Sequence, residues 1–290
     1  MVQMKKIIIL FMMIFMFSNL FSQSKIRTWE GVESMNKEKK EILIYPASPD
    51  NNNGGAVIVC PGGSYHHLGV PHEGKRSAEW FNKHGFSAFV LCYRTSYNGD
   101  HHPAMIQDFQ RCMQFVKENA DEYGIDTTKV GAIGYSAGGH LVTMSGAFGK
   151  ENFIKEIGID AKVGLRPNWI AAIYPVVSMQ DSIAHIRSRR NLIGKDNLTK
   201  ENIDKFSMEM QIPDDMPPTY IQASIDDDVV DYRNSVALDK ALTAKNINHK
   251  FVLFETGGHG YGMKNCDFAE ESKWQDILLQ WIKDINIYDK

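Results

Sequence analysis

The chain has 290 residues, a hydrophobic content of 43% and a formal net charge of −3. This length and hydrophobic content suit one large α/β domain with a buried core. The mildly acidic balance argues against a nucleic acid or an anionic membrane surface as a partner. No repeat, low-complexity block or linker rich in Pro, Gly or Ser marks the start of a second domain.

The first 22 residues have the pattern of a secretory signal peptide. Lys5 and Lys6 precede an apolar run from Ile7 to Phe17, and a small residue, Ser22, ends the segment. The run is too short for a comfortable membrane span. We therefore expect cleavage after Ser22, with an uncleaved anchor as the alternative. The mature protein, 23–290, would be secreted or periplasmic, without stable insertion in a membrane.

Strand and helix patterns alternate along the rest of the chain. The run AVIVC at 56–60 is continuously apolar, as expected for a central parallel strand buried on both faces. Strands that alternate with helices predict a largely parallel sheet covered by helices on both faces. The predicted strands are 41–45, 56–60, 86–93, one from Val130, 168–174, 219–224 and 250–254, and the predicted helices are 75–83, 103–119, one from Ala137, 233–245 and one at the C-terminus.

Four cysteines are scattered along the chain without close pairs. Cys60 and Cys92 lie in apolar strand runs, and Cys112 lies on the apolar face of a predicted helix. We interpret them as small buried hydrophobic residues, since their spacing is not that of a zinc site. Export would permit a disulfide, and for these three and Cys266 the sequence leaves that alternative open.

The segment GYSAG at 134–138 joins a predicted strand to a predicted helix. Ser136 stands between Gly134 and Gly138, which is the spacing of a nucleophile elbow. A serine on so sharp a turn has a strained backbone, and the residues two before and two after it approach too closely for a Cβ. The helix that begins at Ala137 directs its positive dipole end at any anion formed beside the serine. We therefore predict Ser136 as a nucleophile.

A serine hydroxyl needs a base within hydrogen-bond reach, and the base needs an orienting acid. In folds that carry a nucleophile elbow, the acid and then the histidine follow the serine along the chain. His259 lies in the loop GGHGYG after a predicted strand, whereas His249 lies at a strand edge, so we predict His259 as the base. The acid belongs to the run 226–228, in which the physical argument ranks the middle aspartate only slightly ahead.

A tetrahedral intermediate also needs preorganised hydrogen-bond donors. We predict the backbone N–H groups of Ala137 and, in the loop after strand 56–60, of Gly63 and Ser64. A bare turn is the alternative for this loop. The run GVPHEGK at 69–75 fits the letters of a phosphate loop, but Arg76 replaces the required Ser or Thr, so we predict no nucleotide cofactor.

Several other polar residues lie near these motifs. Tyr65, His66 and Tyr97 are predicted to line the substrate cleft, with a surface loop as the alternative, and His140 is interpreted as a packed structural residue. The segment 175–218 is predicted to form a small lid or a solvated helix. We predict no metal site, because the histidines that follow the oxyanion loop or precede helix 103–119 lack a matching carboxylate spacing; they are His66, His67, His72, His101 and His102.

These motifs, in this order, resemble the α/β-hydrolase fold esterases grouped with acetylxylan esterases and the bacterial BD-FAE feruloyl esterases. The resemblance rests on PGGSYHHL, PHEGK, GYSAGGHL, PPTYIQASIDDDVV and GGHGYGM, and it covers the chain from about Trp29 to the C-terminus. It implies an α/β-hydrolase fold and the same roles for the serine, the histidine and the three N–H donors named above.

The resemblance also selects one of the three aspartates. In such relatives the acid commonly stands four residues before a proline, whose place is taken here by Asp231. Counting back from that position selects Asp227, ahead of Asp226 and then Asp228.

The combined reading predicts an exported serine carboxylic-ester hydrolase that uses no metal or organic cofactor. It would remove acetyl or other small acyl groups from plant-type polysaccharide through an acyl-enzyme on Ser136, and the substrate follows from the resemblance and from export. The alternatives are a feruloyl or general short-chain carboxylesterase, a serine peptidase of the same fold, and a binding protein without catalysis. Related peptidases usually carry a large extra domain, and a binding protein would be expected to have a damaged triad. The oligomeric state stays open.

Overall fold

The computed structural model describes residues 23–285, and the predicted signal peptide lies outside them. Within this part of the chain the strands form one eight-stranded sheet in the order β1-β2-β4-β3-β5-β6-β7-β8. The pairs β1–β2 and β2–β4 are antiparallel, and all the other neighbours are parallel. The strands are β1 (Ser24–Arg27), β2 (Glu41–Tyr45), β3 (Ala56–Cys60), β4 (Ser87–Leu91), β5 (Val130–Tyr135), β6 (Ile170–Ile173), β7 (Thr219–Ser224) and β8 (His249–Phe254).

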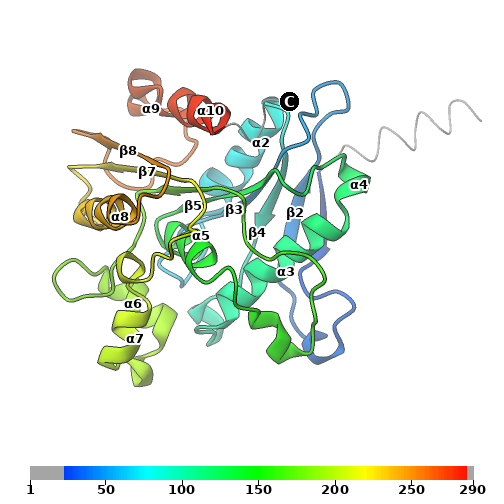
Figure 1. Cartoon of the computed structure of the whole chain (residues 1–290), viewed down its shortest axis with the longest axis horizontal. Helices are drawn as coiled ribbons and strands as arrows, with labels where there is room; N and C mark the ends of the chain where they lie inside the picture. Colours follow the sequence, from blue (N-terminus) through cyan, green and yellow to red (C-terminus); the bar gives the residue numbers. More distant parts are fainter. Residues whose placement is uncertain (1–22, 286–290) are drawn as a thin grey trace, which may run out of the picture.

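Helices cover both faces of this sheet (Figure 1). On one face lie α3 (Ala104–Glu118), α5 (Ala137–Ala147) and α8 (Arg233–Ala244), and on the other lie α2 (Arg76–Lys83) and α10 (Trp274–Asp284). The remaining helices are α4 (Ala120–Tyr123), α6 (Ile186–Ile193), α7 (Lys200–Lys205) and α9 (Asp267–Ser272).

The two hydrophobic cores follow from the alternation of side chains along buried parallel strands. In β3, Ile58 and Cys60 belong to the core under α3 and α5, whereas Val57 and Val59 belong to the core under α2 and α10. This explains why the run AVIVC is apolar at every position. The predicted largely parallel sheet with helices on both faces is confirmed.

The segment 175–218 packs onto the main domain. It contains α6 and α7, and several of its apolar side chains join the same core as α3 and α5. Val176 and Val177 lie a few residues after β6, and Leu192 and Phe206 lie further along. The segment thus leaves the sheet, forms two short helices beside α8 and returns to β7 (Figure 1).

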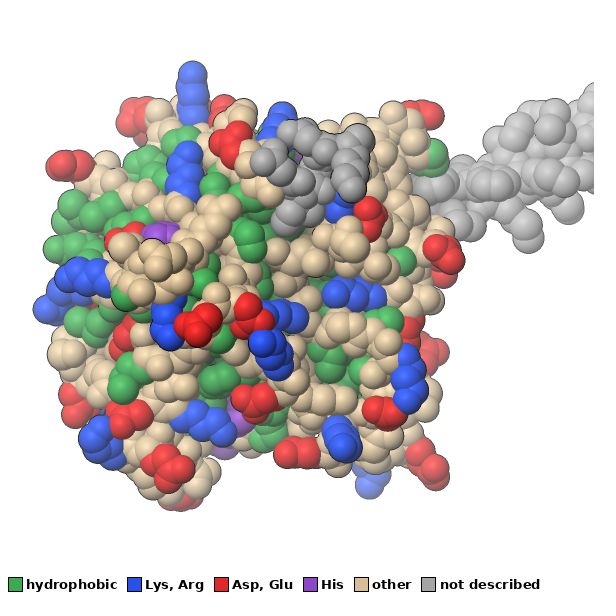
Figure 2. Space-filling model, in the orientation of Figure 1, with side chains coloured by type: hydrophobic (Ala, Val, Ile, Leu, Met, Phe, Trp, Pro, Cys, Tyr) green, Lys and Arg blue, Asp and Glu red, His purple; other side chains and the backbone are tan. Residues whose placement is uncertain are grey.

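All four cysteines are free thiols in this structure, and Cys60 and Cys112 are buried. Within residues 23–285, no helix combines the length and hydropathy needed to cross a bilayer. Acidic and basic side chains are interspersed on the face of the molecule that Figure 2 shows. That face therefore presents no broad area of one charge.

Candidate active site

Ser136 lies at the sharp turn between β5 and α5. Its φ of 52° and ψ of −118° are unusual for a residue with a side chain. A Cβ on Gly134 would lie 2.0 Å from the carbonyl oxygen of Gly138, and a Cβ on Gly138 would lie 2.1 Å from the carbonyl oxygen of Cys60. Both positions therefore require glycine, as the spacing predicts.

The structure brings Ser136, His259 and Asp227 into one hydrogen-bonded line. His259 Nε2 lies 3.0 Å from Ser136 Oγ, and His259 Nδ1 lies 2.7 Å from Asp227 Oδ2. The carboxyl group of Asp227 identifies Nδ1 as the protonated nitrogen, which leaves Nε2 to accept the serine proton. Ser136 follows β5, Asp227 follows β7 and His259 follows β8. The three residues therefore meet at the carboxyl edge of the parallel sheet.

The three adjacent aspartates have three different environments. The Asp227 side chain is 1% exposed, and its Oδ1 accepts the N–H groups of Val229 and Val230, both at 2.9 Å. Asp226 accepts the N–H groups at 257 and 258 and so holds the loop that carries the histidine. Asp228 is exposed. Only Asp227 contacts the imidazole of His259 among these three.

The predicted oxyanion donors lie on both sides of the serine. Within residues 23–285, the N–H groups of Gly63, Ser64 and Ala137 donate to no other protein group. Gly63 and Ser64 line a pocket of about 190 Å³ together with Ser136 and His259. The loop adopts positive φ angles, and a Cβ on Gly63 would lie 2.1 Å from the carbonyl oxygen of His67.

Tyr65 is buried below the oxyanion loop, so its predicted place in the substrate cleft is wrong. Its side chain is 0% exposed, and its hydroxyl lies 2.8 Å from His140 Nδ1. His140 Nε2 lies 2.8 Å from the carbonyl oxygen of Phe206 and must donate to it. Burial lowers the pKa of His140 to about 4, so the ring is neutral and accepts from Tyr65. This pair fixes the oxyanion loop to α5.

His66 and Tyr97 lie beside the pocket rather than in its wall. Their rings meet edge to face with centroids 5.5 Å apart, and Tyr97 is 76% exposed. His67 and His72 line the pocket instead. The sequence shows that these histidines follow the oxyanion loop, but it does not show which of their rings line the pocket.

Glu73 is a site residue that the sequence analysis missed. It is buried on a π-helical turn, Val70–Lys75, an irregularity often found at functional sites. Its Oε2 accepts the N–H of Gly62 at 2.7 Å, and its Oε1 accepts the hydroxyl of Tyr174 at 2.9 Å. The same hydroxyl accepts the N–H of Gly262 at 2.9 Å. Glu73 therefore joins the oxyanion loop to the loop of His259.

Burial, followed by the nearby Glu73 carboxyl group, raises the pKa of Tyr174, so the phenol stays protonated and can donate to Glu73. Glu73 is the only acid in the segment GVPHEGK at 69–75, where it stands near Gly69, Val70, Pro71 and Gly74. An acid in such surroundings was the feature of the sequence that could have identified Glu73. Polar side chains in such a run are buried only when they are paired.

We expect Glu73→Ala to lower kcat for p-nitrophenyl acetate by about tenfold to a hundredfold with little change in KM. The reason is that the loop carrying the oxyanion donors loses its anchor, and those donors act mainly in the transition state. Glu73→Gln keeps an oxygen acceptor for the N–H of Gly62 and should recover most of the rate. Steady-state kinetics of both variants check this prediction.

The matched control for this experiment is Glu79→Ala, which removes an exposed acid on the neighbouring helix α2. It should behave as the wild type. Equal losses in Glu73→Ala and Glu73→Gln, or no loss in either, would contradict the positioning role of Glu73.

Among residues 23–285, no group of three or more His, Cys, Asp or Glu side chains is arranged to hold a metal ion.

Comparison with known proteins finds one family model and two curated relatives that match this chain. The family model described as BD-FAE matches residues 43–242. The chain is 33% identical over 213 residues to endo-1,4-beta-xylanase B of Butyrivibrio fibrisolvens, which covers 72% of this chain. It is 29% identical over 244 residues to the acetylxylan esterase of Xylanibacter ruminicola, which covers 82% of this chain.

A solved structure agrees with these sequence matches. The acetyl ester-xyloside bifunctional hydrolase of Caldicellulosiruptor lactoaceticus superposes with a TM-score of 0.80 at 28% identity, covering 91% of this chain and 97% of that one. In contrast, the chain spans only 33% and 47% of the length of the two curated relatives. The shared region is therefore one part of those longer proteins.

Proposed function

The chain belongs to the BD-FAE family of α/β-hydrolase fold esterases, and on that premise we propose that it removes acetyl or other small acyl groups from plant-type polysaccharide. The observation that carries the proposal is the hydrogen-bonded line from Ser136 through His259 to Asp227, at 3.0 and 2.7 Å. Two related proteins, an acetylxylan esterase and an acetyl ester-xyloside bifunctional hydrolase, support an acetylated xylan-type substrate.

The proposed reaction has two symmetrical halves. Ser136 Oγ attacks the ester carbonyl carbon while His259 Nε2 takes its proton, and Asp227 stabilises the imidazolium that forms. The N–H groups of the oxyanion loop and of Ala137 stabilise the negative oxygen. The intermediate then expels the sugar alcohol, which takes the proton from His259 and leaves an acyl-enzyme. Water, activated by the same histidine, releases the acid and restores the serine.

The size of the pocket at Ser136 supports a small acyl group. Its volume of about 190 Å³ lies below the range of roughly 300–1,000 Å³ that is usual for sites holding drug-sized ligands. An acetyl group needs far less room than a feruloyl group. We also propose export, on the basis of the N-terminal pattern in 1–22, because a polysaccharide substrate lies outside the cell.

Four substrates test this function with the purified protein. Acetate release from acetylated xylan and hydrolysis of p-nitrophenyl acetate are expected, with slower hydrolysis of methyl ferulate. Methyl ferulate as the best ester would instead make the protein a feruloyl esterase. Hydrolysis of a dipeptide amide alone would contradict the esterase function, and inertness toward all four would favour a binding protein.

A further inference from the structure

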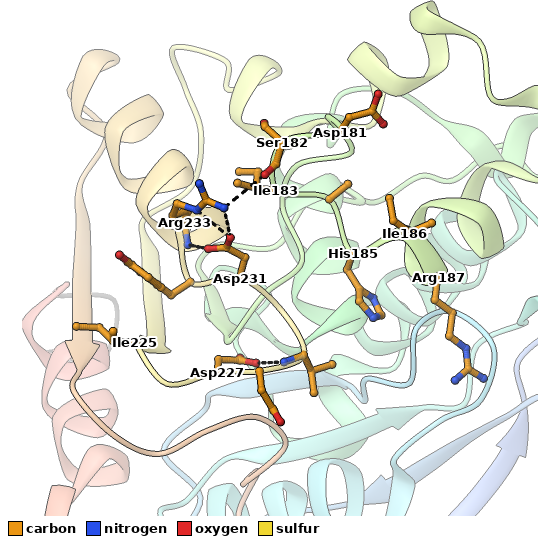
Figure 3. Close-up of a pocket in the computed structure, with 14 residues that line it drawn as sticks. Asp181, Ser182, Ile183, His185, Ile186, Arg187, Ile225, Asp227, Asp231 and Arg233 are labelled. Carbon is orange, nitrogen blue, oxygen red and sulfur yellow. Dashed lines mark hydrogen bonds and ion pairs between the residues drawn. The ribbon is translucent and has the colours of Figure 1, made fainter.

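A second, larger hollow of about 910 Å³ shares a lining residue, Val229, with the catalytic pocket. Figure 3 shows the side chains that line this hollow. Two segments line it: 181–187, which ends in the first turn of α6, and the stretch 225–233, which follows β7. Asp227 and Val229 lie in its wall, and Val229 also lines the small pocket that contains Ser136 and His259. One part of an ester bound at Ser136 can therefore reach this hollow around Val229.

Aliphatic side chains in the hollow face solvent to an unusual degree. Ile186, Ile225 and Val229 are 39%, 46% and 47% exposed. They come from both lining segments and lie in one hollow, whereas exposed apolar residues scattered singly need no explanation. Such a cluster gains free energy when a ligand covers it.

Hydrogen-bonding groups are interspersed with these aliphatic side chains. Asp231 and Arg233 satisfy each other, as the dashed lines in Figure 3 show. The side chains of Arg187 and Asp228, in contrast, form no hydrogen bond or ion pair with any residue of 23–285. His185 Nδ1 lies 2.8 Å from Ser188 Oγ, which leaves Nε2 available to a ligand.

The charge balance of the hollow restricts its ligand. Burial, and then the neighbouring His259, lowers the pKa of His185, so this ring is a neutral hydrogen-bonding group at neutral pH. One free guanidinium and one free carboxyl group remain, of opposite sign. A long acyl chain would desolvate both without compensation, and a phosphate would face the free carboxyl group.

We propose that this hollow binds the sugar units next to the esterified one, on the alcohol side of a neutral oligosaccharide ester. This inference rests on the esterase function proposed above. Sugar rings present apolar C–H faces to the aliphatic side chains and hydroxyl groups to Arg187, Asp228 and His185. The acyl group then occupies the small pocket, and the chain it is removed from occupies the large one.

The test compares an ester with a sugar chain and an ester without one. Ile225→Trp fills the hollow, and Arg187→Ala removes its free donor. For both variants we expect kcat/KM on acetylated xylo-oligosaccharide to fall at least about tenfold further than kcat/KM on p-nitrophenyl acetate, mainly through KM. Leu253→Trp is the matched control, because Leu253 is an aliphatic residue, 38% exposed, that lies outside the hollow. An unchanged ratio in both hollow variants would overturn the proposal.

A binding measurement separates this inference from the esterase function. Ser136→Ala should bind unacetylated xylotetraose, and Ser136→Ala combined with Ile225→Trp should bind it at least about tenfold more weakly, by calorimetry or NMR titration. If the wild type hydrolyses no ester, the esterase function fails, while the titration still decides whether the hollow takes sugar. Equal binding by the two proteins, or no binding by Ser136→Ala, would overturn the sugar site even if ester hydrolysis is found.

Discussion

Replacing Ser136 by alanine should lower kcat on p-nitrophenyl acetate by roughly a thousandfold or more. The hydroxyl is the group that forms the acyl-enzyme. A water molecule in the variant would have to attack the ester directly, and it would not be aligned with His259 as the serine hydroxyl is. Folding should be unaffected, because the side-chain oxygen forms a hydrogen bond only with His259 among the described residues. Initial rates and the thermal midpoint of unfolding measure the two effects separately.

The control for this variant is Ser145→Ala, on helix α5, which begins directly after Ser136. Ser145 is buried, and its hydroxyl donates to the carbonyl oxygen of Val142, far from the imidazole. It should keep its activity and lose a little stability. Substantial turnover by Ser136→Ala would refute the acyl-enzyme mechanism.

The three aspartates should rank in a fixed order when each is replaced by asparagine. Asp227→Asn should lose about a thousandfold to ten-thousandfold in kcat, because the neutral amide neither stabilises the imidazolium nor enforces the productive tautomer of His259. Asp226→Asn keeps one oxygen for the N–H of Gly258, which makes the shorter of the two hydrogen bonds, and should lose only a few-fold. Asp228→Asn should change kcat on p-nitrophenyl acetate least.

The measurement is kcat for the three variants on the same small ester, since that substrate does not need the large hollow. Circular dichroism shows whether each variant folds. A greater loss for Asp226→Asn or Asp228→Asn than for Asp227→Asn would contradict the assignment made from the structure.

Much of the fold could be predicted because the local patterns and the tertiary packing agree. The runs at 41–45, 56–60 and 219–224 coincide with β2, β3 and β7. The run at 56–60 is apolar at every position, as expected for a strand buried on both faces. β1 was missed, because Ser24–Arg27 is a short edge strand with two charged residues and little burial. The helix that was predicted at 103–119 extends from 104 to 118 in the structure, and a separate turn of helix follows at 120–123.

The site divides into what spacing can specify and what it cannot. The elbow could be predicted because its strand, its glycines and its helix are contiguous in the sequence, although the atom that excludes a Cβ at Gly138 is the carbonyl oxygen of Cys60 on β3. Spacing could not show that Tyr65 turns inward, since its loop adopts positive φ angles. The role of Glu73 depends on Tyr174, 101 positions away in the sequence, and such a contact leaves no local pattern.

The close approach of Gly134 and Gly138 to neighbouring backbone has an evolutionary consequence. Because even one added methyl group would collide with a carbonyl oxygen, no series of small substitutions leads away from this turn. Residues on the exposed loops around it tolerate replacement at little cost in stability. Descendants of this chain should therefore diverge in which esters they accept long before they diverge in how they cleave them.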